Sequence, residues 1–326
     1  MISLPHPVAS VVIPTFNDAA QLRRAIDVAR AQTWPAVEIV VVDDGSDVEV
    51  EASIRRWYPG LAGLTVIRHA ANRGVLEALA SGLGRASGEF VYLGSTNDPI
   101  LPGFLETALG ELLRYPQAGF CFFDPGELIG WREDGRSYAL RLAPAATYFS
   151  PDAFADALRR TPFHISSNTA VFRTAALREI GGYRPELGIY ADWFGCFVAA
   201  LRTGAVYVPR VLAYSRRHSG AYSERRRWST ADRLRSSIGI LQVIASEYPD
   251  IAPRVRRSLF ASAFGPRALL AIYRNPSTRY FFTTRGMALA LGRRAWGMVR
   301  PLVGGRARRA ARSIVASIAA GTRHGR

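Results

Sequence analysis

The chain has 326 residues, 48% of them hydrophobic, and a formal net charge of +16 from 42 basic and 26 acidic residues. This composition excludes a disordered chain, and two cysteines are too few for a disulfide framework or a cysteine-based zinc site. No signal-peptide pattern opens the chain, and no run of about 18 apolar residues predicts a membrane-spanning helix. We expect a folded protein of a reducing compartment, in which Cys121 and Cys196 are buried apolar residues rather than a bridged pair.

The charge is distributed unevenly along the chain. Every basic residue is an arginine, and residues 251–326 contain 16 arginines and no acid. Residues 1–250 carry the other 26 arginines and all 26 acids, so they are neutral. Such an asymmetry predicts two environments, or two tasks, for the two parts.

Short apolar runs and helical segments alternate along the chain. Strands are predicted at 8–13, 37–42, 64–69, 89–94, 118–123, 169–173 and about 205–215. Helices are predicted over 19–32, 75–86, 102–114, 151–160, 174–180 and 193–203, and the pattern is helical from 228 onward. Residues 124–150 are rich in turn-forming residues and are expected to be a long loop or an insertion. The alternation is typical of an α/β fold whose mostly parallel, Rossmann-like sheet is flanked by helices.

Polar clusters follow three of the predicted strands, at Thr15-Phe16-Asn17, Asp43-Asp44-Gly45-Ser46 and Ser95-Thr96-Asn97-Asp98. Ligands of open α/β sheets bind at the carboxyl ends of the strands, so these clusters predict a binding crevice. No G-x-G-x-x-G follows the first strand, which argues against a dinucleotide-binding fold.

Six motifs occur in order along the chain: IPTFN, VVDDGS, NRG, ASGEFVYL, GGYRPELGIYADW and YSRRHSGAYS. Together they resemble the family 2 glycosyltransferases, which have a GT-A fold, over roughly residues 8–223. The resemblance implies transfer of a sugar from a nucleotide-diphosphate donor to an acceptor hydroxyl, with inversion at the anomeric carbon. It also implies a GT-A domain over 1–225, with a nucleotide-binding half (1–115) and an acceptor-side half (116–225), before a helical, arginine-rich region at 226–326.

The resemblance assigns the donor pocket to the ends of the early strands. Asp43 would accept a hydrogen bond from the base, with UDP the favoured nucleotide, and Asp44 would shape the same turn. The other implied donor contacts are Pro14, Thr15, Asn17, Asn72, Arg73 and Thr96. The alternative for Asp44, Gly45 and Ser46 is a turn and a helix cap with no ligand.

The D-x-D-D motif of the family falls on Ser95-Thr96-Asn97-Asp98, so two expected carboxylates are absent. The resemblance implies Mg²⁺ or Mn²⁺ on the donor diphosphate, held more weakly than usual by Ser95, Asn97, Asp98 and His218. Hard cations take oxygen ligands, and Mg²⁺ often uses only one or two carboxylates. In the alternatives, Asp98 caps the helix that follows Pro102, and His218 is a surface histidine.

Arginines offer a second source of positive charge for the diphosphate. Arg216 and Arg217, beside His218, can pair with phosphate oxygens. Arg73 is a further candidate for a substitute cation.

Asp192 matches the catalytic base of the family, which takes the proton from the attacking hydroxyl. An unperturbed Asp has a pKa of about 3.9, so burial or late proton transfer must make it effective. The alternative is an N-cap for the helix at 193–203. Trp193 is either an acceptor-stacking ring or a core residue.

The arginine-rich end of the chain predicts a surface contact. In 285–302 an imperfect apolar stripe includes Met287 and Leu291, with Arg285 and Arg293 opposite. Such helices bind anionic lipid surfaces, so we expect 251–326 to make a peripheral membrane contact near a glycan or lipid-linked acceptor. A solvated face with no partner is the alternative. No nucleic-acid partner is expected, because no segment resembles a nucleic-acid module.

These features together predict an enzyme located in the cytoplasm, peripheral on the inner face of the cell membrane. It would act in the assembly of a surface polysaccharide or glycolipid. The alternative from another class is a non-catalytic GT-A scaffold that binds a nucleotide or glycan.

Overall fold

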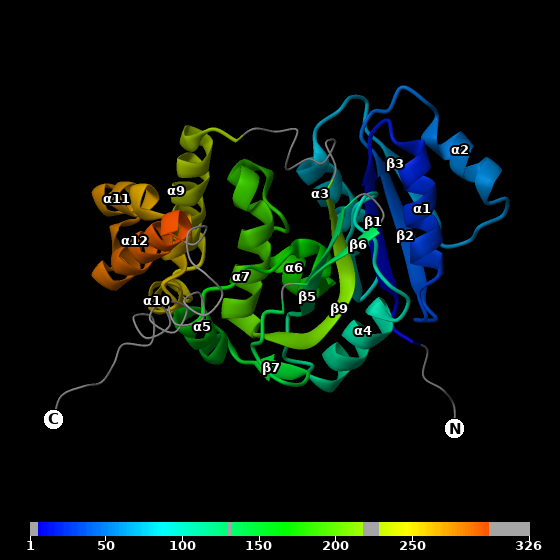
Figure 1. Ribbon diagram of the computed structural model, residues 1–326. Helices are drawn as coiled ribbons and strands as arrows, with labels where there is room; N and C mark the ends of the chain where they lie inside the picture. The colour runs from blue at the N-terminus through cyan, green and yellow to red at the C-terminus, as the bar shows by residue number, and fades with distance from the viewer. Residues whose placement is uncertain (1–5, 130–131, 138, 218–227, 300–326) are drawn as a thin grey trace. The chain divides into compact units, whose positions relative to one another are not determined.

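The computed structural model describes residues 6–129, 132–137, 139–217 and 228–299 (Figure 1). Their contacts divide the chain into two compact units. The first unit comprises the described residues up to Phe149, together with 165–185 and 191–217. The second comprises 150–164, 186–190 and the residues from Trp228 onward.

The described part of the first unit contains one nine-stranded sheet in the order β3-β2-β1-β4-β8-β5-β9-β7, with β6 paired to β5. The strands β1 to β4 are parallel, β8 runs antiparallel between β4 and β5, and β9 is parallel to β5. The predicted α/β fold with a mostly parallel sheet is therefore confirmed. The strands are β1 (Ala9–Thr15), β2 (Val37–Asp43), β3 (Leu64–Arg68), β4 (Phe90–Leu93), β5 (Phe120–Ile129), β6 (Arg132–Ser137), β7 (Thr147–Phe149), β8 (Ala170–Arg173) and β9 (Ala205–Arg217).

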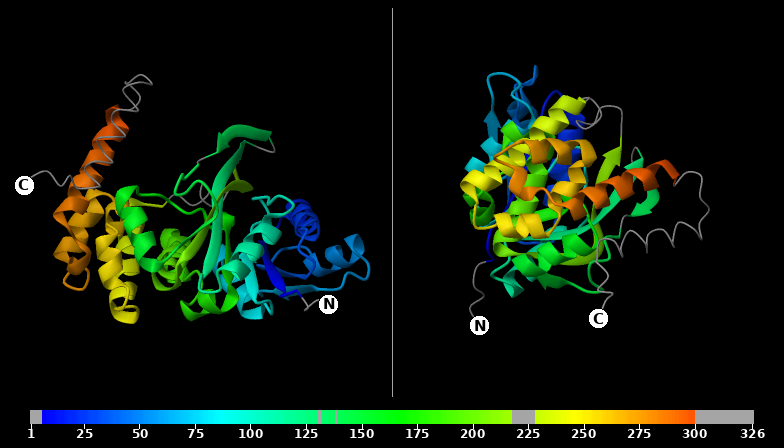
Figure 2. Two further views of the ribbon diagram at one scale, coloured as in Figure 1. Left: turned by 90° about the horizontal axis from the view of Figure 1, so that it is seen from below. Right: turned by 90° about the vertical axis from the view of Figure 1, so that its left-hand side faces the viewer.

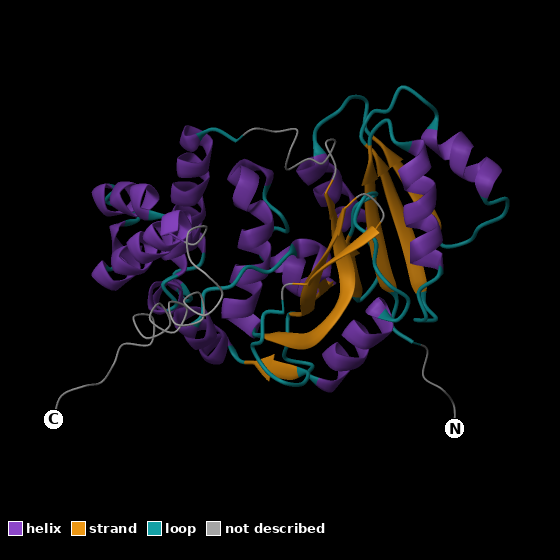
Figure 3. Ribbon diagram, in the orientation of Figure 1, coloured by secondary structure: helices purple, strands orange, loops and turns teal. Residues whose placement is uncertain are grey.

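Helices cover both faces of this sheet (Figure 3). Alternate residues of a strand point to opposite faces, so Val11 belongs to the core that contains Leu22 of α1, whereas Val12 contacts Gly82 of α3. A Cβ at position 82 would lie 2.2 Å from a Val12 methyl, which explains the glycine there. The helices of this unit are α1 (Ala19–Arg30), α2 (Val50–Trp57), α3 (Val75–Arg85), α4 (Phe104–Arg114), α6 (Thr174–Glu179) and α7 (Ala191–Thr203), with a 3-10 turn η1 (Ser167–Thr169).

The prediction of a long loop over 124–150 is wrong. The strand β5 continues to Ile129, β6 forms a hairpin with it that projects from the sheet, and β7 pairs with β9 (Figure 2). The ladder between β5 and β9 shifts register around Asp124 and Pro125, which accommodates a proline in a strand. The Asp124 carboxylate is buried and accepts hydrogen bonds from the Leu140 N–H and the Tyr207 hydroxyl, both at 2.8 Å.

The second unit is helical. Ser229 and Asp232 form a capping box that starts α9, as their spacing favours. The elements are α5 (Pro151–Arg160), η2 (Pro185–Tyr190), α9 (Thr230–Glu247), α10 (Ala252–Arg257), η3 (Phe260–Phe264), α11 (Pro266–Arg274), η4 (Arg279–Phe281) and α12 (Thr284–Val299). In the described ranges, no helix has both the length and the apolar character needed to cross a bilayer.

Candidate functional site

The carboxyl ends of β1 and β2 present two buried polar atoms that make no hydrogen bond within the described residues. Thr15 and Asp43 are register neighbours, so their side chains lie on the same face of the parallel pair. Within the described residues, Thr15 Oγ1 and Asp43 Oδ2 have no hydrogen-bond partner. Asp43 Oδ1 accepts a hydrogen bond from the Ser46 N–H at 2.9 Å, and Arg68 Nη1 forms an ion pair with Asp43 Oδ2 at 3.4 Å. Buried polar atoms are normally hydrogen-bonded, so a bound ligand is the expected partner of Thr15 Oγ1. Asp43 Oδ2, which is ion-paired with Arg68, can accept a hydrogen bond from the same ligand.

The loops that follow β1 and β2 are tied together by Asn17, which has a positive φ of 52°. Its backbone N–H donates to Ser46 Oγ at 2.9 Å, and its side-chain oxygen accepts from the Asp47 N–H at 2.8 Å. Pro14, one residue before Thr15, is the register partner of Val42 on β2. These contacts hold the edge of the predicted nucleotide pocket, although the Asn17 side chain is itself engaged by Asp47.

Asp44 anchors the loop that follows β3. Its Oδ1 accepts from the Arg73 N–H at 2.9 Å and lies 2.7 Å from His69 Nδ1, while Oδ2 accepts from the Gly74 N–H at 2.8 Å. Gly45, at φ 78°, allows the close approach of this loop, since a Cβ there would lie 2.6 Å from the Ala71 carbonyl carbon.

The same anchor places the predicted donor contacts Asn72 and Arg73 beside the end of β2. Asn72 is exposed, and the Arg73 guanidinium pairs with Glu77 at 2.9 Å along α3. The sequence analysis did not predict His69. Its position at the end of a strand is the signal that identified the other polar clusters.

The loop after β4 carries the altered metal motif and contacts β9. The Arg216 N–H donates to Asp98 Oδ1 at 2.9 Å, and Arg216 Nη2 donates to Asn97 Oδ1 at 2.6 Å. Burial raises the pKa of Asp98 to about 6, against the lowering effect of Arg216 and of the Ser95 hydroxyl. The helix-cap alternative for Asp98 is wrong, because α4 begins after Gly103 without a side-chain cap.

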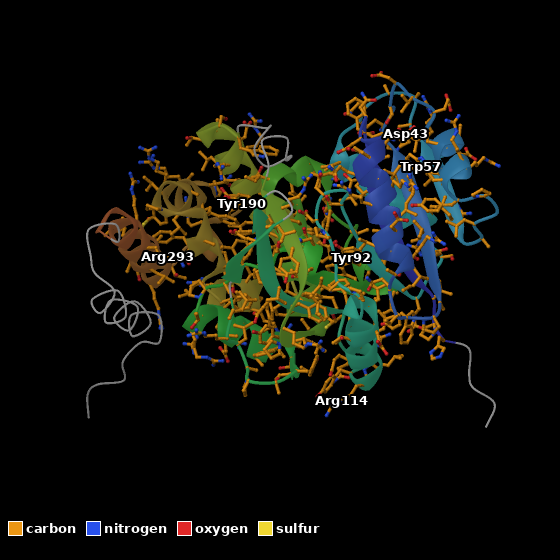
Figure 4. All side chains as sticks on the ribbon, turned by 45° about the vertical axis from the view of Figure 1, so that its right-hand side comes forward. Asp43, Trp57, Tyr92, Arg114, Tyr190 and Arg293 are labelled. Carbon is orange, nitrogen blue, oxygen red and sulfur yellow. The ribbon has the colours of Figure 1, made fainter. Side chains whose placement is uncertain are left out.

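Thr96 and Asp98 line a small pocket of about 40 Å³ that also touches Arg24 and Tyr92. In the described part of the chain the buried Tyr92 hydroxyl lacks a hydrogen-bond partner. Figure 4 marks Tyr92 on β4, away from Asp43 at the strand ends. This pocket is largely apolar, so it does not by itself resemble a diphosphate site.

The donor set of this loop fits a divalent cation poorly. Such a cation needs several oxygen ligands, yet Asp98 is the only carboxylate among residues 95–98 and already accepts the Arg216 N–H. The Asn97 oxygen accepts a guanidinium N–H, and Ser95 Oγ accepts the Asn97 N–H at 3.0 Å. The described residues contain no group of three His, Cys, Asp or Glu side chains placed to hold a metal. The fourth predicted ligand, His218, lies outside the described residues.

Asp192 lies in the first turn of α7, partly buried. Its Oδ1 accepts from the Trp193 N–H at 2.8 Å, and it also accepts a hydrogen bond from the Ser167 hydroxyl. Burial nevertheless raises the pKa of Asp192 to about 6. A carboxylate with this pKa is ionised at neutral pH and is a stronger base than an ordinary Asp.

Short contacts connect Asp192 to the altered motif. Ser167, which contacts Asp192, precedes Asn168, whose Nδ2 donates to the Tyr214 carbonyl at 3.0 Å. The Tyr214 N–H donates to the Pro99 carbonyl at 3.0 Å, next to Asp98. The structure thus brings the predicted base and the loop after β4 to one end of the sheet. Ser167 and Asn168 were not predicted, because no local pattern marks them.

Trp193 is partly buried, and its ring centroid lies 6.1 Å from that of Phe197 on the same helix. This contact accounts for part of the ring surface. Both proposed roles of Trp193, acceptor stacking and core packing, therefore stay predictions.

Comparisons with known proteins identify a family and a fold. A family model described as "Glycosyl transferase family 2" matches residues 10–181. The chain is 33% identical over 127 residues to the uncharacterized glycosyltransferase YibD of Escherichia coli, covering 36% of each chain. It is 31% identical over 134 residues to an uncharacterized glycosyltransferase of Rickettsia prowazekii, covering 41% of this chain and 40% of the relative. The chain thus spans about two fifths of the length of these relatives.

Two solved structures share the fold. S. aureus TarS 1-349 in complex with UDP-GlcNAc matches with a TM-score of 0.63 at 17% identity, covering 95% of this chain and 89% of its own. The mannosyltransferase PcManGT of Pyrobaculum calidifontis, in complex with GDP-Man and Mn²⁺, matches with a TM-score of 0.53 at 21% identity. The second match covers 97% of this chain and 86% of the other. At these identities the likeness is one of fold: the sheet and its helices are those of GT-A glycosyltransferases.

Proposed function

Because this chain belongs to glycosyl transferase family 2, we propose that it transfers a sugar from a nucleotide-diphosphate donor to an acceptor hydroxyl, with inversion at the anomeric carbon. We favour UDP as the donor nucleotide, since TarS is solved with UDP-GlcNAc and with UDP, whereas PcManGT is solved with GDP-Man. Thr15 and Asp43 would contact the base, since Thr15 Oγ1 and Asp43 Oδ2 are buried and lack hydrogen-bond partners within the described residues.

Asp192 carries the proposal for transfer rather than binding alone. The acceptor oxygen attacks the anomeric carbon, its proton passes to the Asp192 carboxylate, and the bond from that carbon to the diphosphate oxygen breaks. The nucleotide diphosphate leaves with the electron pair. The raised pKa of Asp192 and its connection through Ser167 and Asn168 to the loop after β4 support this role.

A nucleotide-release assay with acceptor glycans tests the proposal against the scaffold alternative. An enzyme releases the nucleotide diphosphate in repeated turnovers. A scaffold would bind the nucleotide and release no product. The altered motif at 95–98 is the argument for this alternative. The raised pKa of the half-buried Asp192 carboxyl favours the enzyme.

The activity should depend on pH through Asp192. Because the carboxylate must be ionised to accept a proton, kcat/KM should rise about tenfold per pH unit up to about pH 6 and then level off. Nucleotide release measured from pH 4.5 to 8.5 checks this. The pKa of Asp98 is also raised to about 6, so the profile should be repeated in the Asp98→Asn variant. The rise of kcat/KM with pH up to about pH 6 should persist in that variant. A flat profile in either protein would contradict the role of Asp192.

We also propose a peripheral contact with an anionic membrane on its cytoplasmic face, where lipid-linked or surface-glycan acceptors would be reached. The second unit exposes large apolar side chains at Leu270, Tyr273, Tyr280 and Leu291. Among its described residues from 251 onward, the exposed arginines are Arg256, Arg257, Arg267, Arg274, Arg279 and Arg294. Arg256 lies 4.9 Å from the Tyr280 ring centroid, so charge and aromatic surface coincide. Residues 300–326 of the predicted contact lie outside the described residues.

The helix α12 does not expose its predicted polar face in full, because part of that face packs against the rest of the unit. Leu289 and Ala290 are buried, and the Arg293 guanidinium packs inward on Ser262, donating to its Oγ at 2.8 Å (Figure 4). Leu291 is 51% exposed. Leu291 is therefore available to a lipid surface, whereas Arg293 packs within the unit.

Vesicle binding checks the membrane proposal. The triple variant Arg256→Gln, Arg267→Gln, Arg274→Gln should lower partition onto phosphatidylglycerol vesicles about 100-fold, since each arginine near the surface contributes about 1 kcal/mol. The matched control changes three exposed arginines of the first unit, Arg55, Arg56 and Arg85, and should leave partition unchanged. Equal binding of the two triple variants would contradict the proposed surface.

A further inference from the structure

The loop that carries the altered metal motif already holds a cation, the guanidinium of Arg216. Arg216 Nη2 donates to Asn97 Oδ1 at 2.6 Å, and the backbone N–H of Arg216 donates to Asp98 Oδ1 at 2.9 Å. The side chain and the backbone of one residue thus bind two consecutive residues of the motif. A guanidinium keeps its charge at every physiological pH.

The position of Arg216 is set by backbone pairing and not by its side chain alone. The Leu101 N–H donates to the Leu212 carbonyl at 2.8 Å, and Ile100 forms an antiparallel bridge with Ala213. The Tyr214 N–H donates to the Pro99 carbonyl at 3.0 Å. Residues 98–101 are therefore paired with the end of β9, which holds the guanidinium beside the loop before any ligand arrives. Preorganised charge of this kind needs little rearrangement when a reaction develops negative charge.

The identity of residue 97 decides how much of this charge a ligand can use. An aspartate at 97 would form an ion pair with Arg216 and neutralise it. Asparagine accepts the same hydrogen bond without a charge, so this contact does not neutralise the guanidinium. The guanidinium near the Asn97 oxygen also repels a divalent cation from that oxygen. The uncharged Asn97 and the guanidinium beside its oxygen both favour a site that works without a divalent cation.

We propose that the Arg216 guanidinium supplies the positive charge at the donor diphosphate, so that donor binding and sugar transfer proceed without a divalent metal ion. This inference rests on the proposed function. As the bond between the anomeric carbon and the diphosphate oxygen breaks, the leaving oxygens gain negative charge, and two guanidinium N–H groups can donate to them. The acceptor proton still passes to Asp192, and no further reactant is required.

Calorimetric titration with UDP, GDP, CDP and dTDP tests the proposal, each in EDTA, in Mg²⁺ and in Mn²⁺. The preferred nucleotide should bind with about the same Kd in all three conditions. Arg216→Ala should weaken that binding about 10- to 100-fold, whereas the affinity for the matching nucleoside without phosphates should not change. Arg216→Lys should recover part of the loss, because it restores the charge without the planar fork.

Two further variants keep the test specific. Arg210→Ala removes an exposed arginine from the same strand and should leave all affinities unchanged. Asn97→Asp should weaken binding in EDTA, because it neutralises Arg216, and Mn²⁺ should then restore it. Thermal unfolding of each variant confirms that it is folded before its affinity is compared.

The outcomes separate the inference from the proposed function. Wild-type binding that requires Mg²⁺ or Mn²⁺ would overturn the inference while leaving the glycosyltransferase proposal intact. Metal-independent binding that Arg216→Ala does not weaken would overturn it as well. No binding of any nucleotide diphosphate in any condition would overturn both.

Discussion

Asp192→Asn is expected to lower kcat by about 10²- to 10⁴-fold, the contribution typical of a general base. Asparagine has the same shape and can still accept the Trp193 N–H and the Ser167 hydroxyl, so the local structure should persist. It cannot take the proton from the acceptor. The Kd for the donor nucleotide, measured by calorimetry, should therefore change little while nucleotide release falls.

Stability provides the control for this variant. The folded-state pKa of Asp192 is raised to about 6, above the ordinary value of 3.8, so its ionised form destabilises the folded state as pH rises through that range. At pH 8 the neutral Asn should melt at the same temperature as wild type or higher. Glu51→Gln, an exposed change on α2, should leave both activity and melting unaltered. A donor Kd that rises in parallel with the loss of activity would show that Asp192 binds the donor instead of acting as the base.

Asp44→Ala is expected to lower the free energy of unfolding by about 3 kcal/mol, because it leaves the partners of a buried carboxylate without an acceptor. Asp44 is 3% exposed, and its two oxygens contact His69, Arg73 and Gly74. Loss of this anchor should also release the loop that carries Asn72 and so weaken nucleotide binding. Urea unfolding followed by circular dichroism measures the first effect, and calorimetry the second.

Asp47→Ala is the matched control for Asp44, since both acids follow β2 in the same turn. Asp47 is exposed and bonds only with Asn17 among the contacts described for it. Its loss should cost no more than about 1 kcal/mol, as is usual for a surface hydrogen bond. If both variants lost the same stability, the carboxylate of Asp44 would not be the anchor of the loop.

Much of the fold could be predicted from local pattern. The strands β1, β2 and β4 are buried on both faces, so their sequences are continuous apolar runs that stand out without any neighbour. Asp18 caps α1 by accepting the Gln21 N–H at 3.3 Å, as the Asn-Asp pair before an amphipathic segment indicates. The same logic located Thr15, Asp43 and Asp98, because the polar residue that ends a parallel strand is adjacent in sequence to the run that identifies it.

Other features depended on partners far along the chain. Residues 124–137 form strands because β5 pairs with β9, more than 80 positions later, and with β6. The turn-forming residues in this segment are visible in the local sequence, whereas its pairing partner is not, so the local pattern predicts a loop. Asp44 and His69, 25 positions apart, and Arg216 and Asn97, 119 apart, likewise meet only after the sheet is assembled.

The sequence by itself thus determined the α/β alternation and the polar clusters at the carboxyl ends of the strands, and it predicts Asp192 as the base. Only the tertiary structure decided that Asp44 anchors a loop and that Arg216 lies on the altered motif. The reason is physical: periodicity and capping are set by neighbours within a few residues, whereas the partner of a charged side chain is set by which distant strands pair.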